Sequence, residues 1–98
     1  MNMQNLMAQA QKMQKDIMKK KEAINQKEYD VDNEFVSVVM MGSKKVKTIK
    51  IKKTTIAEDD VEILEDMISL AINNVIDKID KDTEKELGAY GNSLGGMF

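Results

Sequence analysis

The chain has 98 residues, which is the length of one domain. A domain this small buries only about 60–65% of the surface that its unfolded chain exposes, so its own core gives marginal stability. The sequence contains no Cys and no His, which excludes disulfides, thiolate metal sites and the usual zinc ligands. Association with a second copy is therefore the remaining route to a larger core, and we expect no metal and no cofactor.

The net charge of −2 hides a strong asymmetry along the chain. Residues 1–27 carry six Lys and two acids, a net charge of +4, and residues 28–56 carry six Lys and four acids, a net charge of +2. Residues 57–98 carry three Lys and eleven acids, a net charge of −8. Every basic residue is Lys, which suits contact with phosphates better than bidentate reading of base edges. Any nucleic-acid surface is thus expected in the N-terminal half.

Several function classes find little support. No apolar run reaches the length of a membrane span, and the first residues lack the basic start and apolar block of a signal peptide. We therefore expect a cytoplasmic protein with no membrane partner. Without His or Cys, and without a Ser in a nucleophile-elbow pattern, we expect no enzyme and no small-molecule substrate.

The first predicted element is a basic helix within residues 1–27. Its apolar residues recur at helical spacing in one narrow stripe, and most of its lysines lie off that stripe. The stripe consists of Leu6, Ala10, Met13, Ile17 and Ile24. A helix of about 35–40 Å with so narrow a stripe lacks a partner within a small monomer, so we expect it to pack against another chain.

Residues 28–56 predict three antiparallel strands. Alternating polar and apolar residues indicate a short edge strand at 28–34, and β-branched and aromatic residues indicate a second strand at 35–41. Gly42 and Ser43 predict a turn. Alternation resumes at 46–52 and predicts the other strand of a hairpin, whose lysines protect the sheet edge from unwanted pairing.

Residues 57–82 predict an acidic amphipathic helix, with carboxylates in its first turns where the helix dipole favours them. Its apolar face is wide enough to need cover from both the sheet and a second copy. The residues that we expect at a dimer interface are Leu64, Ile68, Ile72, Val75 and Ile79. Residues 83–98 hold four of the five glycines and predict a last helical turn at 83–87 followed by a loose tail.

Three segments stand out together: MQNLMAQAQKMQ at 3–14, DDVEILEDMI at 59–68 and LGGMF at 94–98. In order, spacing and length they resemble the YbaB/EbfC family of bacterial nucleoid-associated proteins over essentially the whole chain, most sharply at 59–68. The resemblance implies an α+β protomer of helix, three-stranded antiparallel sheet and helix. It also implies an intertwined homodimer with projecting long helices. Double-stranded DNA is then the partner, bound in the nucleoid with weak sequence preference, and no enzymatic activity or cofactor is implied.

The chain departs from the family pattern in two places. Segment 30–34 is acidic and has none of the glycines that members often carry there, and Lys52-Lys53 and Ala57-Glu58 stand where members often have Asp-Pro. Two opposite effects follow. The extra lysines enlarge the basic surface, whereas the acidic segment weakens DNA contact near it.

Two groups of lysines are candidates for phosphate contact. The first helix carries Lys12, Lys15, Lys19, Lys20 and Lys21, and the hairpin carries Lys44, Lys45 and Lys47, followed by Lys50, Lys52 and Lys53. Each group has an ordinary alternative role, as a solvated helix face or as a charged strand edge. Our leading hypothesis is a dimeric DNA-binding protein. The alternative is a dimeric protein–protein adaptor or chaperone-like protein that uses faces rich in the nine methionines.

Overall fold

The computed structural model of the protein describes residues 2–52 and 56–88. In chain order the elements are α1 (Met3–Gln26), β1 (Glu28–Asp32), β2 (Val36–Met41), β3 (Val46–Ile51), the 3-10 helix η1 (Glu58–Asp60) and α2 (Val61–Leu87). The predicted α+β fold of helix, three antiparallel strands and helix is confirmed. The turn at 83–87 is part of α2, and the remainder of the expected tail, 89–98, lies outside the described residues.

The three strands form one antiparallel sheet with β2 in the centre. In the β1–β2 pair Tyr29 lies opposite Met40 and Val31 opposite Val38. In the β2–β3 pair Ile49 lies opposite Val38, and a register irregularity follows at Met40. Because directly opposite residues share a face, the register gives the sheet one apolar face and one face of mixed polar and charged residues.

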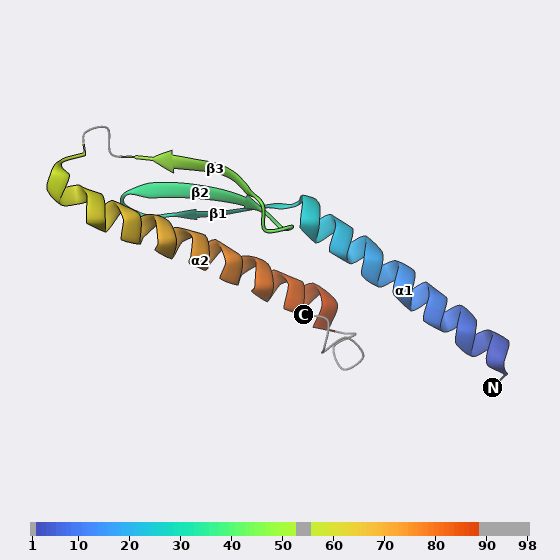
Figure 1. The fold of residues 1–98 in the computed structure, drawn as a ribbon. Helices are drawn as coiled ribbons and strands as arrows, with labels where there is room; N and C mark the ends of the chain where they lie inside the picture. The colour runs from blue at the N-terminus through green and yellow to red at the C-terminus, as the bar shows by residue number, and fades with distance from the viewer. Residues whose placement is uncertain (1, 53–55, 89–98) are drawn as a thin grey trace.

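The long helix α2 packs on the apolar face, mainly over β1 and β2 (Figure 1). Residues four apart on the helix meet alternate residues of β2, as expected for helical and strand periodicities. The buried contacts are made by Ala71, Val75 and Ile79 of the helix and Val36, Val38 and Met40 of the strand. All six residues of β3 are exposed, so the edge of the apolar face lies open beside α2.

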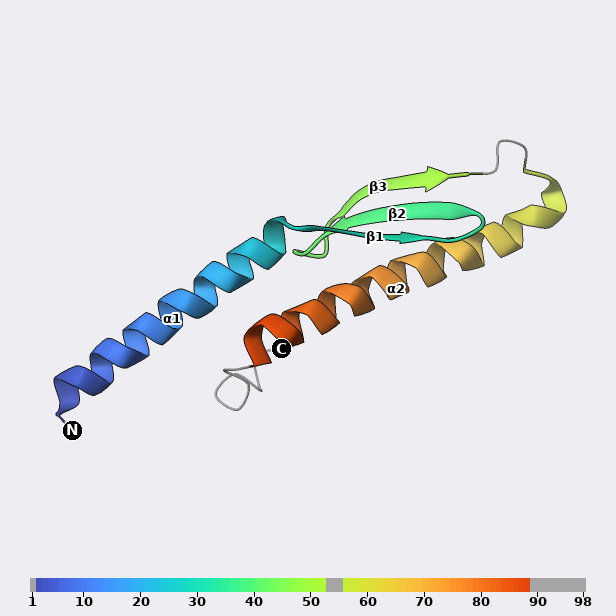
Figure 2. The ribbon, with the colours of Figure 1, turned by 180° about the vertical axis from the view of Figure 1, so that it is seen from behind.

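Helix α1 leaves the body at the end of the sheet and runs outward beside the C-terminal half of α2 (Figures 1 and 2). Its first turn is capped by Asn2, whose Oδ1 accepts a hydrogen bond of 2.9 Å from the Asn5 N–H. Only Ile17 and Ile24 of this helix are buried. The same stripe continues outward with Leu6 (43% exposed) and Met13 (42% exposed), which nothing among the described residues covers.

The turn between β2 and β3 packs directly on the end of α1. The Gly42 N–H donates a hydrogen bond of 2.9 Å to the carbonyl of Lys27, the residue that joins α1 to β1. A Cβ added at Gly42 would lie 1.7 Å from the carbonyl oxygen of Ile24. This position therefore requires glycine, because any side chain would push α1 away from the sheet.

We expect Gly42→Ala to destabilise the protein by about 1–3 kcal/mol, the usual cost of forcing an extra carbon into a packed site. Urea unfolding at fixed protein concentration measures the effect. Gly88→Ala is the matched control, because nothing lies within 4 Å of a Cβ at Gly88 and alanine is the better helix former. Equal stability losses for the two variants would contradict this account of the turn.

Candidate nucleic-acid interface

Three lysines of α1 share one exposed face. At about 100° per residue, Lys12, Lys15 and Lys19 lie within about 60° of one another around the helix axis. The apolar stripe that contains Ile17 and Ile24 lies on nearly the opposite side. All three lysines are exposed and have no ion-pair or hydrogen-bond partner among the described residues. The face thus presents three mobile positive charges over about 10 Å of helix, which is suited to contact with successive phosphates.

The other two candidate lysines of α1 turn toward the body of the protein. The Nζ of Lys20 donates a hydrogen bond of 3.3 Å to the backbone carbonyl of Glu86, near the end of α2. Both Lys20 and Lys21 are partly buried and interact within the protomer. Their first role is therefore to seat α1 against α2, and they lie on either side of the apolar stripe instead of extending the lysine face.

Three of the hairpin lysines form ion pairs with acids of the same protomer. Lys47 of β3 pairs with Glu28, and Lys52, which directly follows β3, pairs with Asp32 at 2.6 Å. Both ion pairs therefore reach over the central strand to β1. Lys44 pairs with Asp80 of α2 at 2.9 Å. Lys45 is the one member of the predicted hairpin set (Lys44, Lys45 and Lys47) without a partner among the described residues. The acidic first strand therefore offsets much of the charge that the hairpin adds.

The five residues expected at a dimer interface fall into two groups. Val75 and Ile79 are fully buried against the sheet of their own protomer. Leu64, Ile68 and Ile72 are only partly buried, and they pack at the margin of the core. Their assignment to an interface stays a prediction.

The apolar surface left open lies beside those three residues. It comprises Ile49 and Ile51 on β3, with exposed fractions of 43% and 44%, and Val61 at the start of α2 with 46%. Helical geometry places Ile72 and Ile76 on the side of α2 that faces β3, because Met67, Asn74 and Lys78 lie toward β1. Sequence periodicity did not single out the β3 residues, because their alternation with lysines also fits an ordinary exposed edge.

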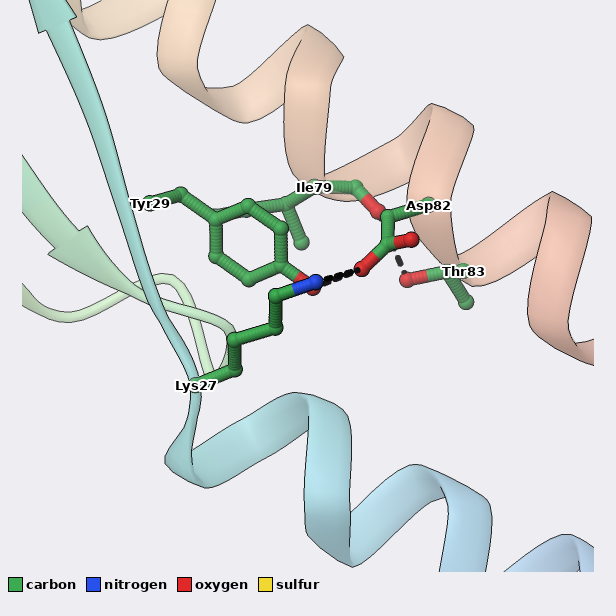
Figure 3. A network of polar contacts seen from close by, with 5 residues as sticks. All are labelled: Lys27, Tyr29, Ile79, Asp82 and Thr83. Atoms are coloured by element: carbon green, nitrogen blue, oxygen red, sulfur yellow. Dashed lines mark hydrogen bonds and ion pairs between the residues drawn. The ribbon is translucent and has the colours of Figure 1, made fainter.

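The sheet and α2 form the body of the protein, and we call the projecting helix α1 the arm. A polar network joins α1, β1 and α2 at the point where the arm leaves the body (Figure 3). The Tyr29 hydroxyl donates a hydrogen bond to Oδ2 of Asp82, and the Nζ of Lys27 forms an ion pair of 3.1 Å with the same oxygen. The Lys27 Nζ also lies 5.2 Å from the centre of the Tyr29 ring. One α2 carboxylate thus holds a residue of the sheet and the residue that directly follows α1. We call Lys27, Tyr29 and Asp82 the hinge triad.

The described residues contain no group of three or more His, Cys, Asp or Glu side chains arranged to hold a metal ion. No helix within the described residues combines the length and the apolar character needed to cross a membrane. The exposed carboxylates of α2 are therefore treated as a charged surface.

A family model described as the YbaB/EbfC DNA-binding family matches residues 1–94. The chain belongs to the YbaB/EbfC family. A nucleoid-associated protein of Enterococcus faecalis is 38% identical over 98% of this chain and 94% of its own length. Nucleoid-associated proteins of Ligilactobacillus salivarius and Ruminiclostridium cellulolyticum are 35% and 40% identical, over 99% and 98% of this chain and 95% and 85% of their own lengths. The resemblance inferred from the sequence is confirmed, and the YbaB/EbfC family is a DNA-binding family, not an enzyme family.

The hinge triad has a defined pH dependence. The hydrogen bond from Tyr29, followed by the interaction with Lys27, holds the pKa of Asp82 below its usual value of 3.8. Burial, followed by the hydrogen bond to Asp82, raises the pKa of Tyr29 above its usual value of 10.0. Since the Asp82 pKa is lower in the folded state, the unfolded state binds more protons in acid. Asp82 therefore contributes stability above about pH 4, and this contribution is lost as the pH falls through its folded pKa.

We expect Asp82→Asn to be less stable than the wild type at pH 6, and the difference to shrink as the pH falls toward 3. Urea unfolding at fixed protein concentration across this pH range measures it. Asp77→Asn removes a carboxylate from the same helix without touching the triad, so it should not reproduce the trend. A difference that stays constant with pH would show that the ionised carboxylate of Asp82 is not what stabilises the junction.

Proposed function

We propose that this protein binds duplex DNA as a homodimer, through lysine–phosphate contacts made by α1, with weak sequence preference. The observation that carries the proposal is the exposed face of Lys12, Lys15 and Lys19, which has no partner among the described residues. Neutralising phosphates releases condensed counterions, which supplies affinity without reading sequence. Such a protein acts where the chromosome is, in the nucleoid of the cytoplasm.

The charges of α2 support one direction of approach for DNA. It carries exposed carboxylates toward both of its ends, and these repel phosphates. The exposed carboxylates of α2 are Glu62, Glu65, Asp66, Asp77, Asp80, Glu84 and Glu86. The lysine face of α1 is then the surface on which a duplex rests with the least repulsion, and the acidic side of α2 stays in solvent.

A second copy is proposed as the cover for the open apolar surface beside β3. That surface combines Ile49, Ile51 and Val61 with the predicted interface residues Leu64, Ile68 and Ile72. The adjacent α2 residues Val75 and Ile79 contribute by shaping the core beneath it. Contiguous apolar surface exposed to water is unfavourable in a small domain. A self-complementary contact about a two-fold axis removes this surface from water in both copies at once.

The first test changes three lysines together. Lys12→Gln, Lys15→Gln and Lys19→Gln in one variant should weaken duplex binding and reduce the salt dependence of log Kobs by about 0.9 for each phosphate that the variant no longer neutralises. Fluorescence anisotropy on AT-rich and GC-rich duplexes over a salt series measures both. Similar affinity for the two duplexes is expected, because phosphates carry no sequence information.

The matched control removes the same charge from paired lysines. A variant with Lys44→Gln, Lys47→Gln and Lys52→Gln loses three charges that Asp80, Glu28 and Asp32 already offset, so its salt dependence should change less. Equal losses of affinity in the two variants would mean that overall charge, not the α1 face, binds DNA. No duplex binding by the wild type even at low salt would reject the proposed function.

The second test concerns the dimer. Ile49→Lys should shift the protein toward monomer in sedimentation velocity and lower its stability, because a charge would replace an apolar contact between copies. Leu70→Lys is the matched control, since Leu70 is similarly exposed (49% against 43%) but lies on the other side of α2. If both variants stay dimeric, the second copy does not cover the β3 surface.

A second candidate function is a protein–protein adaptor. It is favoured by the methionines exposed on α1, where Met3, Met7 and Met18 have exposed fractions of 75%, 59% and 63%. Methionine adapts to irregular apolar partners. Binding of a protein client that is insensitive to salt and to the triple Lys→Gln change would favour this function.

A further inference from the structure

The arm formed by α1 is attached to the body through very little chain. Lys27 is the single residue between the end of α1 at Gln26 and the start of β1 at Glu28. Beyond that junction the arm is seated by two buried residues, Ile17 and Ile24, together with the partly buried lysines that face α2. Its orientation therefore depends on these contacts and on what holds Lys27 at the junction.

Four interactions converge on Lys27. Its N–H donates to the carbonyl of Ile24 at 3.1 Å, and its own carbonyl accepts from the Gly42 N–H at 2.9 Å. Its ammonium pairs with Asp82 and lies over the ring of Tyr29. The backbone contacts fix the position of the junction, and the side-chain contacts restrict the direction in which the chain leaves the helix.

The partners of Lys27 belong to rigid parts of the body. Tyr29 is 7% exposed and belongs to the core cluster, and its strand is held in register with β2. Asp82 lies one turn beyond the buried Ile79 on α2, so its carboxylate is carried by a helix packed on the sheet (Figure 3). A contact from the arm to these two side chains therefore transmits the orientation of the sheet and α2 to α1.

We infer that the hinge triad of Lys27, Tyr29 and Asp82 positions the α1 arm so that its lysine face meets the DNA backbone. The inference rests on the proposed function. It adds residues that affect DNA binding without contacting a phosphate themselves. Asp82 and Tyr29 are positioning residues, acting through the orientation of a helix on which other residues bind.

The length of the arm makes its angle important. Lys12 lies fifteen residues from Lys27, which is about 22 Å along a helix. A tilt of about 10° at the junction would move Lys12 by about 4 Å. An ion pair with a phosphate requires the two charged atoms to be within about 4 Å, so a tilt of this size is enough to break it. In a dimer both arms tilt, and the spacing between the two lysine faces changes as well.

The inference predicts an effect opposite to that of charge alone. Asp82→Ala removes a negative charge and frees the Lys27 ammonium. If only the overall electrostatic field of the protein matters, both changes should strengthen DNA binding. Without the positioning contact the arm instead moves, which weakens binding. We expect about three- to tenfold weaker duplex binding for Asp82→Ala at physiological salt, the effect of removing roughly one lysine–phosphate interaction.

Asp77→Ala is the matched control. It removes the same charge from the same helix, and its carboxylate makes no contact with the triad. This variant should bind duplex DNA as tightly as the wild type or slightly more tightly. Tighter binding by Asp82→Ala as well would overturn the inference, because the arm would then be held without the triad.

Tyr29→Phe tests the triad with little risk of a folding defect, because it removes only the hydroxyl and keeps the aromatic ring in the core. It should weaken DNA binding in the same direction as Asp82→Ala while its far-UV circular dichroism and dimer mass stay those of the wild type. Unchanged affinity with Tyr29→Phe would show that the Tyr29 hydrogen bond takes no part in positioning.

A distance measurement tests the arm without DNA. The chain has no Cys, so Gln9→Cys on α1 and Ser69→Cys on α2 provide two unique, exposed spin-label sites. Pulsed electron paramagnetic resonance, on labelled protein mixed with excess unlabelled protein, gives the distance distribution within one protomer. We expect a narrow distribution in the wild type and in Asp77→Ala, and a broader or shifted one in Asp82→Ala and Tyr29→Phe.

The two readouts separate this inference from the proposed function. Suppose that the distance distribution broadens in Asp82→Ala, but that the triple Lys→Gln variant binds DNA as tightly as the wild type. The α1 face would then be rejected as the DNA surface, whereas the triad would still be what holds the arm. A distribution unchanged by Asp82→Ala would reject the triad itself, whatever the DNA affinity.

Discussion

The packing of α2 against the sheet is the contact on which the other features of the protein depend. A helix of 27 residues is about 40 Å long, whereas the six residues of β2 span about 20 Å. The helix therefore extends past the sheet. Its overhanging C-terminal turns supply Asp82, the Glu86 carbonyl and the buried Leu87, which meet α1 where the arm leaves the body. Because α2 covers two strands and leaves β3 open, the same packing also creates the apolar surface proposed for a second copy.

Charge pairing within the protomer then determines which lysines face solvent without a partner. The acids of β1 and α2 offset Lys44, Lys47 and Lys52, and the overhang of α2 engages Lys20. Among the described residues, the exposed lysines left without a partner include Lys45 and Lys50 of the hairpin and the face of Lys12, Lys15 and Lys19 on α1. The N-terminal part of α1 extends beyond the end of α2 (Figure 2). The acidic first strand thus does not cancel the basic character of the protein as a whole; it reduces the part that the hairpin contributes.

Much of the fold was predictable because each element carries its own periodicity. The stripe of Ile17 and Ile24, the alternation around Val36 and Val38, and the four-residue spacing of Val75 and Ile79 each indicate one element without knowledge of the others. The end of α2 was harder to predict, since the charged residues at 84–86 obscure the helical periodicity that the buried Leu87 continues.

The candidate site was less predictable, because its members interact across elements. Lys47 pairs with Glu28 over an intervening strand, which only the register of three strands reveals. Periodicity shows that Val75 and Ile79 need cover, but it cannot tell the sheet of the same chain from a second copy. Asp82 looked like one acid among many in the sequence. Its role follows from Tyr29 and Lys27, which lie more than fifty residues away.

The arm itself explains why orientation has to be controlled. The first half of α1 packs on nothing among the described residues, and an isolated helix of about 12 residues is only marginally stable in water. Its apolar stripe and its lysine face point in nearly opposite directions, so one side is suited to protein and the other to phosphates. Such a helix can bind both at once only if its rotation about the junction is limited. In the arrangement that we propose, a single buried tyrosine and one carboxylate at the hinge limit this rotation, and neither side chain lies on the lysine face of the arm.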